Sequence, residues 1–235
     1  MRLNIHTRWI RRSGAGGGPT PPTATVGSVF VKICGVTRPA DALAAVDATA
    51  DAIGLNFVTT SRRCIDLETA GAILAVVPDH VMTVGIFQGY RADEILEITG
   101  ALGLGAAQLH GGEGPAFTGM VAAGVKTVIK AVAAESPSVR TVDGHGADIV
   151  MLDAAVPGGG IPFEWSLVGD LVARHRILLA GGLRPDNVAE AIRTVRPWGV
   201  DVASGVETEP RHKDRDAIAR FVAEARGAGE QLLEF

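Results

Sequence analysis

Two residues suited to proton transfer, a cysteine and an aspartate, end apolar, β-type runs in this sequence. Cys34 ends the run VFVKIC and is followed at once by glycine, and Asp153 ends the run DIVMLD. A carboxyl group kept protonated by low-dielectric surroundings can act as an acid, and a thiol whose pKa is lowered by positive charge can act as a base. Lys32 lies on the same side of an extended strand as Cys34 and supplies such a charge. The alternative is a buried structural cysteine, the commoner use of cysteine in an apolar run.

Small residues form two turns further along the chain. Gly181 and Gly182 follow the run RILLA, and Ser204 and Gly205 follow GVDVA. Backbone N–H groups approach an anion closely at such turns, and the start of a following helix adds positive partial charge. These turns predict a site for a phosphorylated small molecule, although glycine also serves tight turns elsewhere in the chain.

These residues become neighbours only if their strands end at one edge of a sheet. Short apolar runs alternate with longer helical patterns at intervals of roughly 20 to 30 residues, the length of one βα unit. The eight runs span residues 29–34, 52–57, 82–87, 106–110, 127–132, 148–153, 176–181 and 199–205. We therefore predict a single (β/α)8 TIM barrel, whose site forms at the C-terminal ends of the strands. A doubly wound sheet is the alternative, but it uses fewer strands, and no G-x-G-x-x-G follows the first run.

Helix-start signals support the alternation of strands and helices. Asp66 precedes LETAGAILAVV, Pro185 and Asp186 precede NVAEAIRTV, and Asp214 comes shortly before AIARFVAEA. Short polar side chains at such positions accept hydrogen bonds from the first free N–H groups of a helix.

Length and composition narrow the classes of protein to which the chain can belong. The chain has 235 residues, of which 47% are hydrophobic, and this suffices for one barrel domain over residues 29–235. No apolar run reaches the roughly 18 residues of a membrane span.

Two cysteines, Cys34 and Cys64, favour a reduced, cytoplasmic setting over a disulfide framework. After residue 28 the chain carries 18 basic and 26 acidic side chains, and this net charge of −8 disfavours nucleic acid as a partner.

Residues 1–28 differ from the rest of the chain. They contain four arginines, no acidic residue, a glycine run and the sequence PTPP, without apolar periodicity. This composition predicts a flexible basic extension outside the folded domain. It also permits a transit peptide, but the apolar core of a secretory signal is missing.

No cofactor motif accompanies these candidates. The cysteines and the six histidines do not recur at metal-binding spacings, and neither G-x-S-x-G nor a P-loop occurs. A reaction without metal or cofactor is the simplest prediction, with Cys64 in a structural role.

Taken in order, a set of motifs resembles the phosphoribosylanthranilate isomerase family of tryptophan biosynthesis. The resemblance runs from Val31 to Asp214, and its specificity comes from the order and spacing of the motifs KICGVT, GLNFVTTSRR, VGIF, QLHG, MLD, FEW, LAGGLRPDNV and GVDVASGVE…KD. It implies an intramolecular oxidoreductase that performs an Amadori rearrangement without a cofactor. The substrate would be N-(5-phosphoribosyl)anthranilate and the product 1-(2-carboxyphenylamino)-1-deoxyribulose 5-phosphate.

The resemblance also implies residue roles. Asp153 would protonate the furanose ring oxygen as general acid, and Cys34 would remove the C2′ proton of the resulting Schiff base as general base. Arg63 would bind the anthranilate carboxylate, which suits a bidentate guanidinium. His110 and Asp201 would contact the substrate, Asp201 as an acceptor for ribose hydroxyls. The turns of Gly181, Gly182, Ser204 and Gly205 would hold the phosphate.

Two segments depart from the pattern that the family usually has. Ser61-Arg62-Arg63 stands in place of Ser-Pro-Arg, so the loop loses a fixed φ and gains a second cation that can compete with Arg63. The segment PGGGIPFEW, residues 157–165, replaces a Gly-Gly-Thr-Gly element and lacks its threonine hydroxyl. We expect changes in substrate affinity and weaker loop closure or activity.

Two other functions remain open on the sequence alone. One is a paralogous sugar-phosphate isomerase of a specialised pathway, since phosphate-binding barrels host many reactions. The other is a non-catalytic barrel that binds a phosphorylated metabolite, which the presence of both Cys34 and Asp153 disfavours. The sequence leaves monomer and homodimer equally open.

Overall fold

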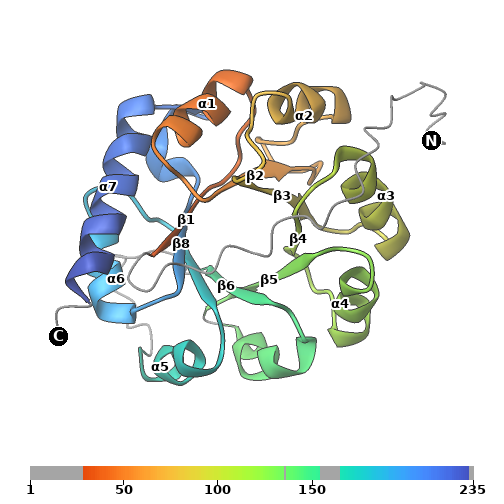
Figure 1. The fold of residues 1–235 in the computed structure, drawn as a ribbon. Helices are drawn as coiled ribbons and strands as arrows, with labels where there is room; N and C mark the ends of the chain where they lie inside the picture. Colours follow the sequence, from red (N-terminus) through yellow and green to blue (C-terminus); the bar gives the residue numbers. More distant parts are fainter. Residues whose placement is uncertain (1–28, 135, 154–164, 233–235) are drawn as a thin grey trace.

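The computed structural model describes residues 29–134, 136–153 and 165–232. Eight parallel strands close into a barrel in sequence order, with β8 paired to β1 (Figure 1). The strands are β1 (Phe30–Ile33), β2 (Ala52–Asn56), β3 (Met82–Phe87), β4 (Ala106–Leu109), β5 (Thr127–Ala133), β6 (Ile149–Asp153), β7 (Ile177–Ala180) and β8 (Gly199–Val202). The predicted (β/α)8 barrel is confirmed, and each of the eight predicted runs matches one strand, although β5 extends one residue beyond its run.

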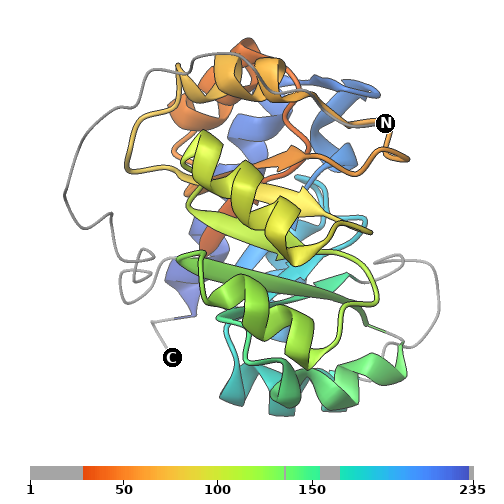
Figure 2. The ribbon, with the colours of Figure 1, turned by 90° about the vertical axis from the view of Figure 1, so that its right-hand side faces the viewer.

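Helices surround the barrel, as the two ribbon views show (Figures 1 and 2). The α-helices are α1 (Pro39–Asp47), α2 (Leu67–Leu74), α3 (Ala92–Leu102), α4 (Pro115–Ala122), α5 (Trp165–Arg174), α6 (Val188–Val195) and α7 (Arg215–Gln231). Between β5 and β6 the chain forms a 3-10 segment, η1 (Pro137–His145), in the place of an α-helix. Helix α7 lies between α6 and α1 and so completes the outer ring (Figure 1).

Two of the three predicted helix starts are capped as expected. The Asp66 side chain accepts a hydrogen bond from the N–H of Thr69 at the start of α2. Asp214 accepts from two N–H groups at the start of α7. Helix α6 begins later than the predicted signal, at Val188, and the Asn187 side chain before it accepts from the backbone N–H of Arg184.

Alternation along the strands separates an apolar barrel interior from the polar mouth. Phe30 belongs to a buried cluster inside the barrel, together with Ala106, Ile129 and Met151 from other strands. Val31 belongs instead to the cluster packed between the strands and the helices. Because side chains alternate between the two faces, Cys34 follows Phe30 and Lys32 on the inward side of β1. The strand pattern thus carries the thiol to the mouth of the barrel.

A small hairpin between β8 and α7 was not predicted from the sequence. The single-turn segment η2 (Ser204–Val206) leads into the antiparallel strands β9 (Glu207–Glu209) and β10 (His212–Lys213). The register of the hairpin shifts between His212 and Lys213, and Lys213 lies opposite Glu207. This hairpin directly follows the predicted phosphate turn of β8, so its side chains lie beside the mouth of the barrel.

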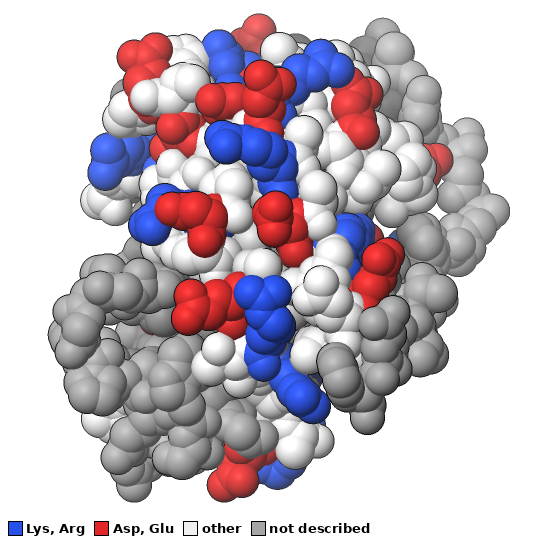
Figure 3. All heavy atoms as spheres, turned by 90° about the vertical axis from the view of Figure 1, so that its left-hand side faces the viewer, with Lys and Arg blue, Asp and Glu red and all other residues white. Residues whose placement is uncertain are grey.

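Two surface features bear on the predicted partners. Within the described ranges, no helix is both long and apolar enough to cross a membrane. Acidic and basic side chains are interspersed on the face that lies to the left in Figure 1, with no broad area of one sign among its described residues (Figure 3). The predicted extension over residues 1–28 lies outside the described residues, so the domain boundary at residue 29 stays a prediction.

Candidate active site

A cavity of about 310 Å³ opens at the C-terminal ends of the strands. Every site residue predicted from the sequence lines it except Gly205, which lies next to Ser204 in the η2 turn; the lining residues among them are Cys34, Arg63, His110, Asp153, Gly181, Gly182, Asp201 and Ser204. A second cavity of about 580 Å³ adjoins it and shares His110 and Asp153. We take the smaller cavity as the site because it brings together the thiol, the carboxylates and both glycine-containing turns. The adjoining cavity contains Lys130, whose ammonium is already held by Glu113 and the Gly111 carbonyl.

The Cys34 thiol lies beside the Lys32 ammonium at the base of this cavity. A Cβ atom placed on Gly54 would come within 3.1 Å of both Cys34 Sγ and Lys32 Nζ, so glycine on β2 leaves the space that they share. Burial raises the pKa of the thiol, Asp201 raises it further, and Lys32 and Lys213 act in the opposite direction. The predicted positive charge is therefore present, but the prediction of a lowered thiol pKa is wrong in this structure, because desolvation outweighs it.

Lys32 and Asp201 form a buried ion pair across the β1–β8 seam. Lys32 Nζ lies 2.7 Å from Asp201 Oδ1, and the lysine side chain is fully buried. Burial acts to lower the pKa of Lys32, but the neighbouring Asp201 and Cys34 raise it above its ordinary value. The ammonium therefore stays charged, and it donates a hydrogen bond to one carboxylate oxygen of Asp201. The structure thus gives Asp201 a partner within the protein that the sequence did not predict.

His110 connects Asp153 to a buried glutamine. Gln108 Nε2 lies 3.0 Å from His110 Nδ1, and His110 Nε2 lies 3.6 Å from Asp153 Oδ2. If the amide donates to Nδ1, the neutral ring carries its proton on Nε2 and points it toward Asp153. Gln108 Oε1 is buried in the cavity wall and has no hydrogen-bond partner among the described residues. Gln108 was not predicted from the sequence as a site residue, although it lies in the motif QLHG.

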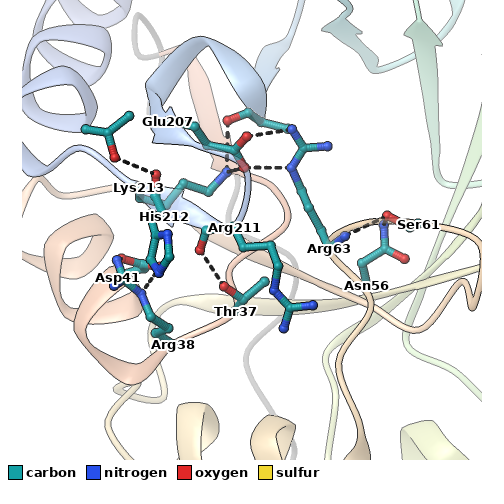
Figure 4. Close-up of polar contacts among 12 residues, drawn as sticks. Thr37, Arg38, Asp41, Asn56, Ser61, Arg63, Glu207, Arg211, His212 and Lys213 are labelled. Carbon is teal, nitrogen blue, oxygen red and sulfur yellow. Dashed lines mark hydrogen bonds and ion pairs between the residues drawn. The ribbon is translucent and has the colours of Figure 1, made fainter.

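Arg63 reaches the cavity from the loop after β2, and its guanidinium forms a bidentate ion pair with Glu207 of the β9–β10 hairpin (Figure 4). Arg63 Nε and Nη2 lie 2.6 and 2.7 Å from the two carboxylate oxygens, and Lys213 Nζ lies 3.1 Å from Glu207 Oε1. Arg62 is exposed and does not line the cavity, so the second arginine of this loop is not part of the cavity wall. Glu207 and Lys213 were missed because they lie in a hairpin that the strand pattern did not indicate.

The two glycine-containing turns lie side by side. Gly181 and Gly182 both have positive φ, 90° and 58°, which L side chains rarely adopt. A Cβ atom on Gly205 would lie 1.9 Å from the Leu183 carbonyl oxygen, so glycine is needed where the β7 and β8 turns touch. The turn after β8 is itself the three-residue 3-10 segment η2, and a hairpin follows it. The predicted start of a longer helix directly after this turn is therefore absent from the described chain.

The donor set of the site favours acid–base chemistry over metal binding. Throughout the described ranges, no group of three or more His, Cys, Asp and Glu side chains is placed to hold a metal ion. A thiol, two carboxyl groups and an imidazole instead share one cavity with the Arg63 guanidinium. Fold and site together define a (β/α)8-barrel protein whose polar site lies at the C-terminal mouth, as in barrel enzymes.

Comparison with known proteins narrows this class. Residues 31–224 match the family model of N-(5′-phosphoribosyl)anthranilate isomerase. The Myxococcus xanthus protein of that name is 48% identical over 210 residues, which cover 85% of this chain and 97% of that protein. The chain belongs to this family, and the family membership predicted from the motifs is confirmed.

Solved structures of the family share the fold. One is a phosphoribosylanthranilate isomerase in complex with reduced 1-(o-carboxyphenylamino)-1-deoxyribulose 5-phosphate, with 39% identity and a TM-score of 0.76. Another contains monomers generated from the dimeric Thermotoga maritima isomerase, with 36% identity and a TM-score of 0.74. Each comparison covers 85% of this chain and 99% of the solved one.

Proposed function

We propose that this chain converts N-(5-phosphoribosyl)anthranilate to 1-(2-carboxyphenylamino)-1-deoxyribulose 5-phosphate, with Asp153 as general acid and Cys34 as general base. The observation that carries the proposal is the convergence of both groups on one cavity with Arg63 and two glycine-containing turns. The family relationship and the related structure with a reduced product analogue support the substrate class.

Ring opening is the first step. Asp153 gives its proton to the furanose ring oxygen, the bond from that oxygen to C1′ breaks, and the amine lone pair forms a protonated Schiff base. The His110 ring lies near the Asp153 carboxyl. It orients the acid and helps to hold the carboxylate that remains after proton transfer.

Proton removal from C2′ is the second step. The protonated Schiff base makes this proton acidic, and the electron pair released from the C–H bond neutralises the cation as the enolamine forms. Burial and Asp201 favour the neutral thiol, so Cys34 first loses its own proton to the solvent in the cavity. The positive charge of the Schiff base favours the resulting thiolate, which then takes the C2′ proton. Lys32 supports the thiolate from the barrel interior. The enolamine then tautomerises to the ketone without an external cofactor.

Substrate binding uses opposite sides of the cavity. The turns at Gly181–Gly182 and Ser204–Gly205 offer backbone N–H groups to the phosphate. Arg63 offers its guanidinium to the aromatic carboxylate. The free oxygen of Asp201 accepts from a ribose hydroxyl while Lys32 holds the other. We expect the enzyme to act in the reduced cytoplasm, as a monomer or homodimer.

The direct test is to supply phosphoribosylanthranilate to the purified protein and follow the loss of substrate fluorescence. We expect turnover without added metal or cofactor. Failure of folded protein to consume the substrate, while it still binds inorganic phosphate, would instead indicate a paralogue for another sugar phosphate or a non-catalytic binding protein. In that case an Arg63→Ala variant that leaves kcat/KM for the true substrate unchanged would identify a substrate without an aromatic carboxylate.

A further inference from the structure

Arg63 and Glu207 form a bidentate ion pair between segments that are far apart in sequence. The Arg63 side chain is 17% exposed and the Glu207 side chain only 6%. The two contacts of 2.6 and 2.7 Å use Nε and Nη2 (Figure 4). A parallel pair of this kind fixes the plane of the guanidinium as well as its position. The Nη1 atom and the second N–H of Nη2 remain outside the pair.

The same arginine is also held along its stem. A Cβ atom on Gly35 would lie 2.3 Å from Arg63 Cδ, so the arginine crosses directly over the residue that follows Cys34. Arg63 lines the cavity and Glu207 does not. Glu207 therefore holds the Nε–Nη2 edge of the guanidinium from outside the cavity lining, and the Nη1–Nη2 edge is left for a ligand.

Lys213 fixes Glu207 in turn. Its ammonium lies 3.1 Å from Glu207 Oε1 and 2.8 Å from the Ala203 carbonyl oxygen, and its side chain is fully buried. Ala203 directly precedes the phosphate turn of β8, so one chain of contacts links that turn to Arg63. Burial lowers the pKa of Lys213, while Glu207 favours its charged form. With Lys213 protonated, the cluster of Arg63, Glu207 and Lys213 has two cations and one carboxylate, which suits an anionic ligand.

We propose that Glu207 is a positioning residue that aims the Nη1–Nη2 edge of Arg63 at the aromatic carboxylate of the substrate. This inference rests on the proposed function. An arginine held in one plane loses less side-chain entropy when it binds a carboxylate than a mobile one does. The negative charge of Glu207 repels the substrate carboxylate, but the Lys213 ammonium compensates that charge. The gain from a fixed orientation of Arg63 therefore outweighs the remaining repulsion.

The test uses Glu207→Gln, which keeps the shape of the side chain but places an amide N–H₂ group against one arginine N–H. We expect KM for phosphoribosylanthranilate to rise by about tenfold, with kcat changed by less than about twofold, because orientation is lost before the chemical step. Calorimetry should give a similar weakening for anthranilate alone and unchanged binding of inorganic phosphate. This split separates a positioning role from general damage to the fold.

Two further variants serve as references. Glu209→Gln alters an exposed glutamate on the same strand, which pairs with His212, and it should leave both ligands and KM unchanged. Glu207→Asp keeps the charge but shortens the reach. It should therefore raise KM as well, and it decides the question if Glu207→Gln does not fold.

The outcomes separate the two proposals. If Arg63→Ala leaves anthranilate binding unchanged, the carboxylate role of Arg63 in the proposed function is wrong. If Arg63→Ala weakens binding but Glu207→Gln and Glu207→Asp leave it unchanged or tighten it, the positioning role of Glu207 is overturned.

Discussion

The Cys34 thiol is subject to opposing electrostatic influences from several elements. Burial and the Asp201 carboxylate on β8 favour the neutral thiol, while Lys32 on β1 and Lys213 on β10 favour the thiolate. Arg63, from the loop after β2, also interacts electrostatically with the sulfur. In this structure the neutral form prevails. Under the proposed mechanism the sulfur loses its proton only when a cationic intermediate lies beside it, and this limits unwanted reactions of a nucleophilic sulfur.

This balance predicts the pH dependence of thiol reactivity. In a Cys64→Ser background, alkylation of Cys34 by iodoacetamide should keep accelerating above the pKa of a free cysteine, because its own pKa is raised. Asp201→Asn removes a negative charge that disfavours the thiolate, so the rate curve should shift to lower pH. Rates measured from pH 6 to 11 test both statements. A wild-type thiol that titrates near neutrality, or an Asp201→Asn curve that does not move, would contradict them.

How well the contacts of individual residues could be predicted depended on how far apart the partners lie in the sequence. Period-two alternation and the barrel rule were enough to place Cys34 and Asp153 at one mouth. The partner of Lys32 is 169 residues away, and that of Arg63 is 144 residues away. These pairings depend on barrel closure and on a hairpin of five strand residues, for which local sequence gives no periodic signal. The sign of the Cys34 pKa shift was missed for the same reason, since it depends on how deeply the closed barrel buries the sulfur.

At the scale of elements, the turns after β7 and β8 form one unit. Gly205 packs against the Leu183 carbonyl so closely that a methyl group has no room. The phosphate-binding role proposed for both turns therefore depends on their mutual contact as well as on their own glycines.

The contact between the turns predicts a cost for Gly205→Ala. The added Cβ must push the two backbones apart, with a loss of about 1–3 kcal/mol in the free energy of unfolding and weaker binding of inorganic phosphate. Gly227→Ala in α7 is the matched control, because a Cβ there meets no atom within 4 Å. It should leave phosphate affinity unchanged and stabilise the helix by up to about 1 kcal/mol. Denaturant unfolding and calorimetry measure both effects. Normal phosphate binding by Gly205→Ala would argue against the paired-turn site.

The strands were easier to predict than the elements around the mouth. Short apolar runs marked all eight strands, since the strands of a closed parallel barrel are buried on both faces. The 3-10 segment η1 and the β9–β10 hairpin carry no comparable pattern, and they differ from a regular βα repeat. The departure at residues 157–165 lies outside the described residues except for Trp165 at the start of α5, so its effect on loop closure stays a prediction.

At the scale of the whole molecule, the pairing of β1 with β8 closes the barrel, and the Lys32–Asp201 ion pair spans the junction of these two strands. Lys32 and Asp201 face each other in register and in side-chain contact. The strands and helices of the described chain lie between Phe30 and Gln231. Barrel closure therefore assembles the site from these elements.

Removal of residues 1–28 should accordingly leave the catalytic barrel intact. The truncated chain must retain Val29, which is buried and whose carbonyl accepts a hydrogen bond from Arg226. We expect kcat/KM and the thermal midpoint to match those of the full chain. A large loss of stability or turnover would place part of the functional structure within the first 28 residues.

The assignment of acid and base is tested most directly by initial rates with phosphoribosylanthranilate for the wild type, Cys34→Ser and Asp153→Asn under identical conditions. The wild type should turn over, and each variant should lose about 10²–10⁴-fold in kcat, the usual contribution of one acid–base group. Inorganic phosphate binding and the unfolding midpoint should be retained in both. A folded variant of either residue that turns over at a near-normal rate would contradict the proposed chemistry.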